Sequence, residues 1–196
     1  VTVCSPETQA PNSDTVTVWY LSPPAAPSLS GTGTTYNGSV SLSWSAPTNA
    51  TSYRLYAQYY SRSSGSWGSY SSVYSGANRS WSQTLAGNQE YAHYYVEAYD
   101  QAGWSGASNT DTAIYPLPAA PSLSGPAQTT NGSISMSWSA PTGATSFQLY
   151  ASYQSRVYGT WTTPGVVYSG GDDGYTDTIS TGKSNASYYV KACSAA

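Results

Sequence analysis

The sequence is poor in charged residues and in the side chains that most often perform catalysis. Only 8% of its 196 residues are charged, and the chain contains one histidine, two cysteines, one methionine and one phenylalanine. With 6 Lys and Arg residues and a net charge of -3, nucleic-acid binding is not expected, because it depends on neutralising phosphates. No apolar run reaches the roughly 18 residues of a membrane span, and two cysteines cannot form a disulfide-rich scaffold.

Candidate catalytic and metal-binding groups are equally scarce. His93 is the only histidine, and the alternation of its strand predicts an outward side chain, which argues against a catalytic triad or a histidine-based metal site. Two acidic clusters are expected to be solvated charges and turn residues, because neither recurs 94 residues away, the spacing of an internal repeat. They are Glu90, Glu97 and Asp100, and Gly170–Gly174 with Asp177. We therefore expect no enzymatic activity, no metal and no cofactor.

What the sequence has in quantity is Tyr, Trp, Ser and Thr, arranged in that repeat. Residues 24–102 align with residues 118–196 without a gap, and 41 of the 79 aligned residues are identical. The most similar stretches are Pro24–Gly31 with Pro118–Gly125, and Asn37–Thr48 with Asn131–Thr142. Such self-similarity identifies two copies of one structural module, each opened by a stiff Pro-rich connector.

Within each copy, apolar and polar residues alternate with a period of two. Val40, Leu42 and Trp44 are separated by serines, and similar alternation follows over residues 52–59 and 92–98. Such alternation, bounded by Gly, Pro, Asn and Ser, predicts half-buried strands of antiparallel sheets. Several such strands in a unit of about 90 residues indicate a β-sandwich.

The motifs of each copy resemble those of fibronectin type III modules. The likeness rests on a Pro-rich start, a Trp strand followed by Ala-Pro-Thr, a Ser-x-x-Leu-Tyr strand and a closing Tyr-Tyr-Val-x-Ala strand: Trp44 and Trp138, Ser52–Tyr56 and Ser146–Tyr150, Tyr94–Ala98 and Tyr188–Ala192. The resemblance implies an all-β chain of two tandem immunoglobulin-like Greek-key β-sandwiches, with strands A, B and E facing strands C, C′, F and G. Val73–Gly76 and Tyr188–Cys193 are similar to type III modules of large secreted bacterial proteins.

The two copies differ at their ends. Copy 1 continues to a final strand, Asn109–Tyr115, which corresponds to strand G, whereas copy 2 stops after its strand F. Residues 1–22 belong to neither copy, but Ser13–Tyr20 align with Ser108–Tyr115. We therefore predict three parts: an N-terminal donor strand segment (1–22), a complete module (23–116) and a module that lacks strand G (117–196).

A sandwich without strand G leaves the edge of strand F open to strand addition. The N-terminal segment has suitable β-branched and aromatic residues, and the expected donor strand comprises Asp14, Thr15, Val16, Thr17, Val18, Trp19 and Tyr20. The expected acceptor strand F comprises Tyr188, Tyr189, Val190, Lys191 and Ala192. The segment cannot reach this edge in its own chain, because the three links from Tyr20 to Pro23 span about 10 Å and the distance to cross is about 60–70 Å.

Donation to a neighbouring copy has no such restriction and predicts a head-to-tail homopolymer that resembles donor-strand pili. The expected function is therefore that of a structural subunit of an extracellular or cell-surface filament. A longer tandem array, divided between strands F and G, is the alternative explanation for the ends of the chain.

The cysteines and the glycosylation motifs fit an extracellular setting. Cys4 and Cys193 occupy equivalent positions at the ends of F-type strands, so docking of the segment predicts an intersubunit disulfide in an oxidising compartment. Two unrelated thiols are the alternative. Candidate N-glycosylation sites begin at Asn37, Asn49, Asn78, Asn131 and Asn185.

The aromatic residues favour a second class of function. Clustered Tyr and Trp side chains bind sugars or strengthen protein interfaces, and those expected at the surface are Tyr56, Tyr60, Tyr70, Tyr95 and Trp104. The alternative function is thus a carbohydrate-binding or spacer module of a secreted polysaccharide-active enzyme or adhesin, with surface glycans as partners. The alternative interpretation, which the residues favour, is that these rings shield sheet faces or pack between adjacent modules.

Overall fold

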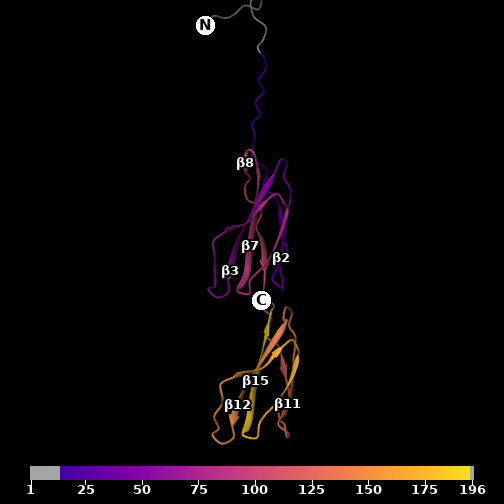
Figure 1. Cartoon of the computed structure of the whole chain (residues 1–196), viewed down its shortest axis with the longest axis vertical. Coiled ribbons are helices and arrows are strands. Elements are labelled where there is room, and N and C mark those ends of the chain that lie inside the picture. The colour runs from indigo at the N-terminus through magenta and orange to yellow at the C-terminus, as the bar shows by residue number, and fades with distance from the viewer. Residues whose placement is uncertain (1–13, 195–196) are drawn as a thin grey trace, which may run out of the picture.

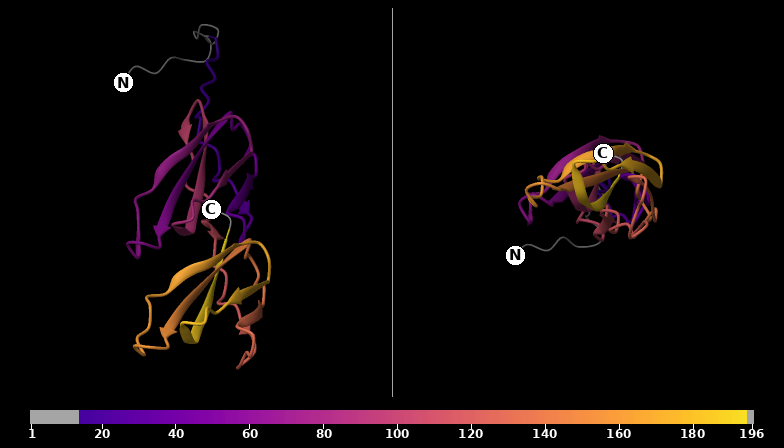
Figure 2. Two further views of the ribbon diagram at one scale, coloured as in Figure 1. Left: turned by 60° about the horizontal axis from the view of Figure 1, so that its bottom comes forward. Right: turned by 90° about the horizontal axis from the view of Figure 1, so that it is seen from below.

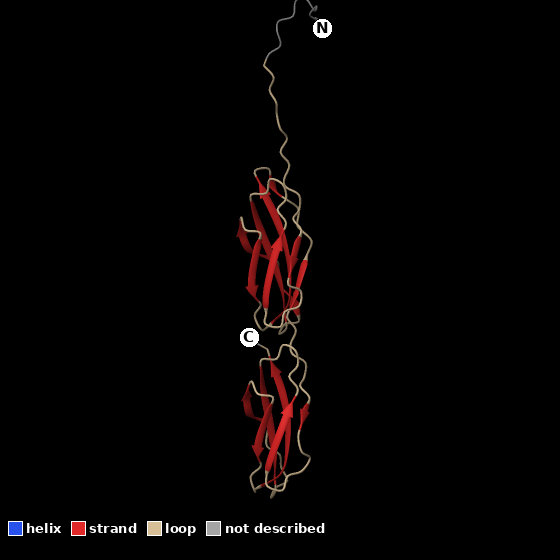
Figure 3. Ribbon diagram, turned by 90° about the vertical axis from the view of Figure 1, so that its right-hand side faces the viewer, coloured by secondary structure: helices blue, strands red, loops and turns tan. Residues whose placement is uncertain are grey.

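The computed structural model describes residues 14–194, and every regular element in that range is a β-strand (Figure 3). The strands form two sandwiches that lie end to end along one axis (Figure 1). Module 1 contains β1 to β9, and module 2 contains β10 to β15. No helix in the described range is long and apolar enough to cross a membrane.

Module 1 consists of two antiparallel sheets. The smaller sheet has the order β1-β2-β6, with bounds Leu29–Gly31, Ser39–Trp44 and Ser80–Thr84. The larger sheet has the order β4-β3-β7-β8, with bounds Ser66–Trp67, Ser52–Ser61, Gln89–Asp100 and Gly103–Trp104. In the larger sheet β5 (Ser71–Gly76) also pairs with β3, and β9 (Asp111–Ile114) also pairs with β7.

Module 2 repeats this plan with fewer strands. Its first sheet has the order β10-β11-β14, with bounds Leu123–Ser124, Ser133–Trp138 and Gly174–Thr178. Its second sheet has the order β13-β12-β15, with bounds Gly165–Gly170, Ser146–Ser155 and Lys183–Cys193. Viewed obliquely and along the long axis, corresponding strands of the two modules lie on the same side (Figure 2).

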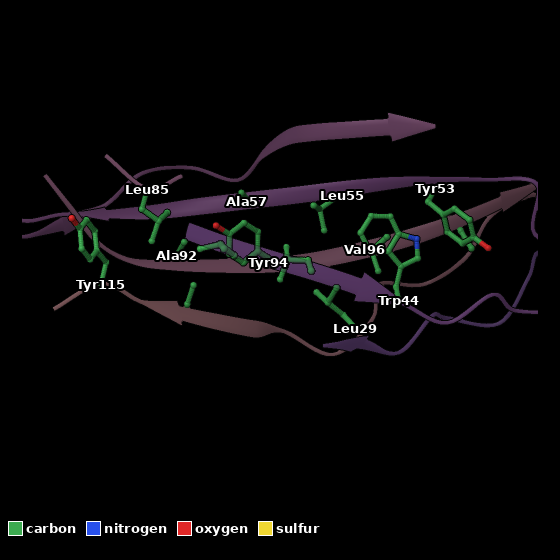
Figure 4. Close-up of a cluster of buried hydrophobic side chains, with 14 residues drawn as sticks. Leu29, Trp44, Tyr53, Leu55, Ala57, Leu85, Ala92, Tyr94, Val96 and Tyr115 are labelled. Atoms are coloured by element: carbon green, nitrogen blue, oxygen red, sulfur yellow. The ribbon is translucent and has the colours of Figure 1, made fainter. Parts of the chain in front are cut away.

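The alternating sequence builds the core of module 1 as expected. Val40, Leu42 and Trp44 of β2 are buried, whereas the serines between them are exposed. The Trp44 indole packs against Tyr53 and Tyr74 at ring-centroid distances of 5.9 and 5.8 Å. Figure 4 shows the other end of the core, where β9 leads into Tyr115 beside Leu85. Period-two burial from both sheets therefore fills the sandwich.

The strand order confirms the predicted fold. Strands A, B and E form one sheet and strands C, C′, F and G the other, which is the type III-like arrangement in tandem. Three strand lengths differ from the sequence prediction: β3 extends to Ser61, β7 extends to Gln89–Asp100, and β9 is limited to Asp111–Ile114. Before β9 the regular ladder is replaced by side-chain bonds: the Ser108 hydroxyl accepts from the N–H of Val96 at 3.0 Å, and the Asn109 side chain bonds the N–H and C=O of Leu29, each at 2.9 Å.

The N-terminal segment and the junction between modules occupy opposite ends of module 1. Residues 14–22 form no strand in this chain and lead away from module 1 along the long axis (Figures 1 and 3). At the other end Tyr36 of module 1 lies against Gly143 of module 2, where a Cβ would come within 2.8 Å of Cδ1 of the ring. Strand β15 points its C-terminal end toward this junction (Figure 1).

Candidate functional site

The two modules differ most at the outer edge of strand F. In module 1, β7 lies between β3 on one side and β8 and β9 on the other. In module 2, β15 pairs with β12, and no strand within residues 14–194 lies on its other edge. An edge strand of this length exposes a row of N–H and C=O groups that can pair with another strand.

Strand β9 shows what occupies that edge in module 1. Its residues pair with β7 in register, with Asp111 opposite Tyr94 and Ala113 opposite Ala92. Beyond this ladder the Tyr115 N–H donates to the C=O of Glu90 at 2.8 Å. Strand G thus continues the β7 ladder past the end of β9.

Strand G also connects the two sheets of module 1. The Ile114 N–H donates to Gly33 at 2.9 Å, and the Ile114 C=O accepts from Thr35 at 2.8 Å. The side chains of Ala113 and Tyr115 are 0% and 1% exposed. Strand G therefore links the two sheets along one edge of the sandwich and also contributes buried side chains to its core.

In module 2 a groove of about 490 Å³ occupies the equivalent place. Its lining residues come from β10, β11, β15 and the loops beside them, and each lies 94 residues after a residue of module 1 that surrounds β9 or lies near it. They are Leu123, Gly125, Pro126, Ala127, Gln128, Thr129, Ile134, Met136, Ile179, Ser184, Asn185, Ala186 and Tyr188. Within the described residues, the groove therefore lies where β9 lies in module 1.

The open groove leaves the core of module 2 less buried. Tyr94 and Val96 of β7 are fully buried, whereas their equivalents Tyr188 and Val190 of β15 are half-buried. Burial of apolar area is the main stabilising contribution to a sandwich. A strand added beside β15 would therefore increase the stability of module 2, whose core residues on that strand are only half-buried.

Residues 14–22 match strand G of module 1 at its core-facing positions. Aligned on β9, Val16, Val18 and Tyr20 take the places of Asp111, Ala113 and Tyr115, the residues that face the core. In this chain those three side chains are 83%, 85% and 94% exposed. Alternation of apolar side chains along an exposed extended segment is the pattern of a half-buried strand without its sheet.

A hydrogen-bonded cluster lies behind the groove. The hydroxyls of Tyr153 and Tyr188 donate to Oδ2 of Asp177 at 2.6 and 2.7 Å. Burial, together with the bond to this carboxylate, raises the pKa of both tyrosines above the ordinary value. Asp177 was expected in an acidic turn, but the structure turns its side chain into the sandwich, as the alternation with Tyr175 on β14 could have indicated.

Module 1 has a neutral residue in the equivalent position. Gln83 replaces Asp177, accepts a hydrogen bond from the Tyr59 hydroxyl at 2.9 Å and donates one to Tyr94. The carboxylate of module 1 instead comes from strand G, where one oxygen of Asp111 is buried without a hydrogen-bond partner. Burial raises the pKa of the Asp111 carboxyl.

The other candidate residues are placed as follows. Cys4 lies outside the described residues, so the predicted disulfide stays a prediction; Cys193 is a half-buried free thiol at the end of β15. All five sequon asparagines are exposed: Asn37, Asn49, Asn78, Asn131 and Asn185. His93 stacks on Trp67 at 4.1 Å on the outer face of β7. Within residues 14–194 no three His, Cys, Asp or Glu side chains are grouped as a metal site.

An aromatic face covers the outside of the larger sheet of module 1. Tyr56 and Tyr95 stack with ring centroids 4.8 Å apart, and Tyr70 meets Tyr95 edge-on at 5.0 Å. The Arg54 guanidinium lies 4.2 Å above the Trp104 ring. Module 2 retains only the central pair of this face, since Tyr150 and Tyr189 stack at 4.8 Å while Tyr95's other neighbours are not repeated.

The chain is similar to solved structures of type III modules. An Fn3-like protein from Clostridium thermocellum is 25% identical, with 48% of this chain and 96% of that chain covered and a TM-score of 0.38. The FN1–FN3 domains of chicken CNTN1 are 15% identical, with 88% and 63% covered and the same TM-score of 0.38. No family model and no curated protein matches the chain. The assignment to tandem type III-like sandwiches follows from the strand order of the two modules.

Proposed function

We propose that this protein is a structural subunit of an extracellular filament, which polymerises head to tail by donation of the N-terminal segment. The observation that carries the proposal is the match between one groove and one segment. The groove in module 2 lies where strand G lies in module 1. In the aligned N-terminal segment, Val16, Val18 and Tyr20 occupy the core-facing positions of strand G. Strand donation of this kind is an established mode of protein association, and the role it implies is structural and not catalytic.

The direction of the strands supports an open polymer. Strand β9 runs antiparallel to β7 and leaves module 1 toward module 2 (Figure 1). A segment docked antiparallel to β15 would likewise leave module 2 at its far end, where the next subunit's module 1 would begin. The contact joins two different surfaces and is repeated by translation along the axis, so it generates a fibre and not a closed ring.

The same geometry argues against self-complementation. Residues 14–22 emerge at the end of module 1 that is remote from module 2, and the whole of module 1 separates them from the groove (Figure 1). The short connection from Tyr20 to Pro23 extends about 10 Å at most. An acceptor in a second copy is therefore required.

Electron microscopy and size-exclusion chromatography of the full chain test the proposal. Filaments are expected for the unmodified protein. Val18→Lys places a charge at a core-facing position of the docked strand and should abolish them, because an unpaired buried charge is strongly unfavourable. Thr17→Lys is the matched control, since Thr17 faces outward in the same register and its variant should still polymerise.

Mixing the variants identifies the direction of growth. The Val18→Lys chain retains an intact groove, so it should cap growing filaments and shorten them when mixed with the unmodified chain. Monomers of the unmodified protein, or filaments that form equally well with Val18→Lys, would refute the proposal. On non-reducing gels, a ladder that collapses with reductant would support the predicted bridge between Cys4 and Cys193 of successive subunits.

A second candidate function rests on the aromatic face of module 1. Tyr56, Tyr95, Tyr70 and Trp104 present ring faces and edges, with Arg54 beside them. Flat aromatic surfaces with adjacent polar groups suit the binding of polysaccharides, which would fit a carbohydrate-binding or spacer module of a secreted enzyme or adhesin. Affinity electrophoresis in gels containing soluble polysaccharides tests it: retardation of the protein that is lost in Tyr95→Ala supports glycan binding, and unchanged migration in every gel excludes it.

A further inference from the structure

Each module carries one carboxylate beside its strand F tyrosine, paired opposite Tyr94 in module 1 and hydrogen-bonded to Tyr188 in module 2, but the two modules take it from different strands. In module 1 the carboxylate belongs to Asp111 of strand G, and Gln83 of β6 is neutral. In module 2 it belongs to Asp177 of β14, the equivalent of Gln83. A donor strand docked in module 2 would therefore lie near the Asp177 carboxylate, whereas strand G of module 1 lies near the neutral Gln83 side chain.

The register of strand G fixes which side chain would meet that charge. Asp111 lies directly opposite Tyr94 on β7. Burial is the main reason that the pKa of the Tyr94 hydroxyl is raised, and the Asp111 carboxylate adds a minor contribution. In module 2 the equivalent of Tyr94 is Tyr188, which lines the groove and donates to Asp177. The donor residue aligned with Asp111 is Val16.

We propose that Asp177 and the residue at the Val16 position together select the strand that enters the groove. The groove accepts an apolar side chain opposite Tyr188 and excludes a carboxylate there. The inference rests on the proposed function, since it concerns the specificity of strand donation.

The physical reason is the number of negative charges in one poorly solvated space. Two carboxylates that share a site repel each other, and each is costly to bury without a partner. In module 1, Gln83 is neutral and bonds the hydroxyls of Tyr59 and Tyr94. Asp111 lies opposite Tyr94, and one of its oxygens is buried without a hydrogen-bond partner. In module 2 the Asp177 carboxylate already accepts two hydroxyl hydrogen bonds, and Val16 adds no charge.

Selection of this kind would keep the two strand types apart. The segment Asp111–Ile114 resembles the donor closely enough to compete for the groove during folding or assembly. A repulsive charge against the wrong strand is a common way to obtain specificity between similar partners. The groove would then take the N-terminal segment of another copy in preference to the strand G of module 1.

Assembly of full-length variants tests the selection rule. Val16→Asp gives the donor the residue of strand G and should slow filament growth, followed by light scattering, by about tenfold or more, because one buried like-charge contact shifts an equilibrium by at least that factor. Thr17→Asp adds the same charge to the outward face and should grow at nearly the unmodified rate. Asp177→Gln copies Gln83 of module 1, and the double variant Val16→Asp with Asp177→Gln should recover growth.

The outcomes separate this inference from the proposed function. Filaments of the unmodified chain together with equally fast growth of Val16→Asp would overturn the selection rule and leave strand donation standing. Failure of Asp177→Gln to rescue Val16→Asp, while Asp177→Gln alone assembles normally, would also overturn it. Absence of filaments from the unmodified chain would instead remove the proposed function itself. Synthetic peptides of residues 13–22 with Val16 or Asp at that position, added as inhibitors of growth, give a second readout: only the Val16 peptide should inhibit.

Discussion

Module 1 and module 2 contain nearly the same strands, yet their cores are closed to different degrees. In module 1, Tyr94 of β7 is fully buried beneath strand G, and the tyrosine in the same place of module 2 lines an open groove. The apolar residues of strands B and C are retained in both modules, including Trp44 and Trp138, each 5% exposed. The two modules thus share the core contributed by strands B and C, and in module 1 strand G covers the edge of strand F.

The two modules also differ in the acidic residue near the strand F tyrosine. Where module 1 has Gln83 on β6 and Asp111 on β9, module 2 has Asp177 on β14 and a groove lined by Tyr188. Two sites related by duplication have thus exchanged the position of a single carboxylate. The difference between the modules gives four measurable consequences.

The largest effect is expected for Tyr115→Ala. The Tyr115 ring is 1% exposed beside Gly38 and Leu85, so truncation should destabilise module 1 by about 3–5 kcal/mol, the usual cost of removing a buried aromatic side chain. Chemical denaturation should show an earlier transition for module 1 only. Tyr20→Ala is the matched control: it should leave both transitions of the monomer unchanged, because Tyr20 is 94% exposed. Equal losses for both variants would contradict the comparison.

The second effect concerns ligand stabilisation of module 2. A peptide of residues 13–22, added to the Val18→Lys chain at a hundredfold excess over its dissociation constant, should stabilise one module by about 2.7 kcal/mol. Calorimetry should show the increase in the transition that Tyr115→Ala leaves unaltered, because the groove lies in module 2. A peptide with Val18→Lys should have no effect. A shift of the module 1 transition would mean that the peptide binds elsewhere.

A smaller loss is expected for Asp177→Ala. The substitution removes the acceptor of the Tyr153 and Tyr188 hydroxyls, and hydrogen bonds to a charged group contribute about 2 kcal/mol. Denaturant unfolding should show this loss in module 2. Asp173→Ala, in the exposed turn before β14, should change the same transition little. If the two variants are equally destabilised, the cluster behind the groove does not stabilise the module.

The smallest effect is the pH dependence of module 1. Because burial raises the pKa of Asp111 in the folded state, its ionisation favours the unfolded state. This destabilisation is absent below the unfolded-state pKa, develops as the pH rises through the folded pKa, and is complete above it. Asp111→Asn should therefore raise the stability of module 1 at pH 7 and make no difference near pH 3. Thermal unfolding at both pH values measures this, and a stabilisation that is independent of pH would exclude the electrostatic cause.

The sequence was sufficient to predict the fold because two independent signals agree. The repeat defines the module, and alternation such as Val40, Leu42 and Trp44 defines its strands. The ends of the strands were less predictable, since side-chain bonds of Ser108 to Val96 and of Asn109 to Leu29 replace regular pairing before β9. Such contacts between residues 80 positions apart leave no local pattern.

The candidate site was predictable in outline and not in its chemistry. The alignment of Ser13–Tyr20 with Ser108–Tyr115 indicates a surplus strand from sequence alone. The hydrogen bonds of Asp177 to Tyr153 and Tyr188 were not predicted. The Gly and Asp residues just before Asp177 are typical of a solvated turn, and Asp177 was interpreted as part of that turn. Only the three-dimensional arrangement brings β12, β14 and β15 together around that carboxylate.

Strand β9 has a mechanical consequence. The chain enters module 1 near β1 and leaves it from β9 at the opposite end (Figure 1), so tension along the axis pulls β9 parallel to its neighbours. The hydrogen bonds to Glu90 and to Gly33–Thr35 are then loaded in shear, so they must break together and not one after another. A pulling force would meet its greatest resistance at this strand, and the first module would yield abruptly at high load.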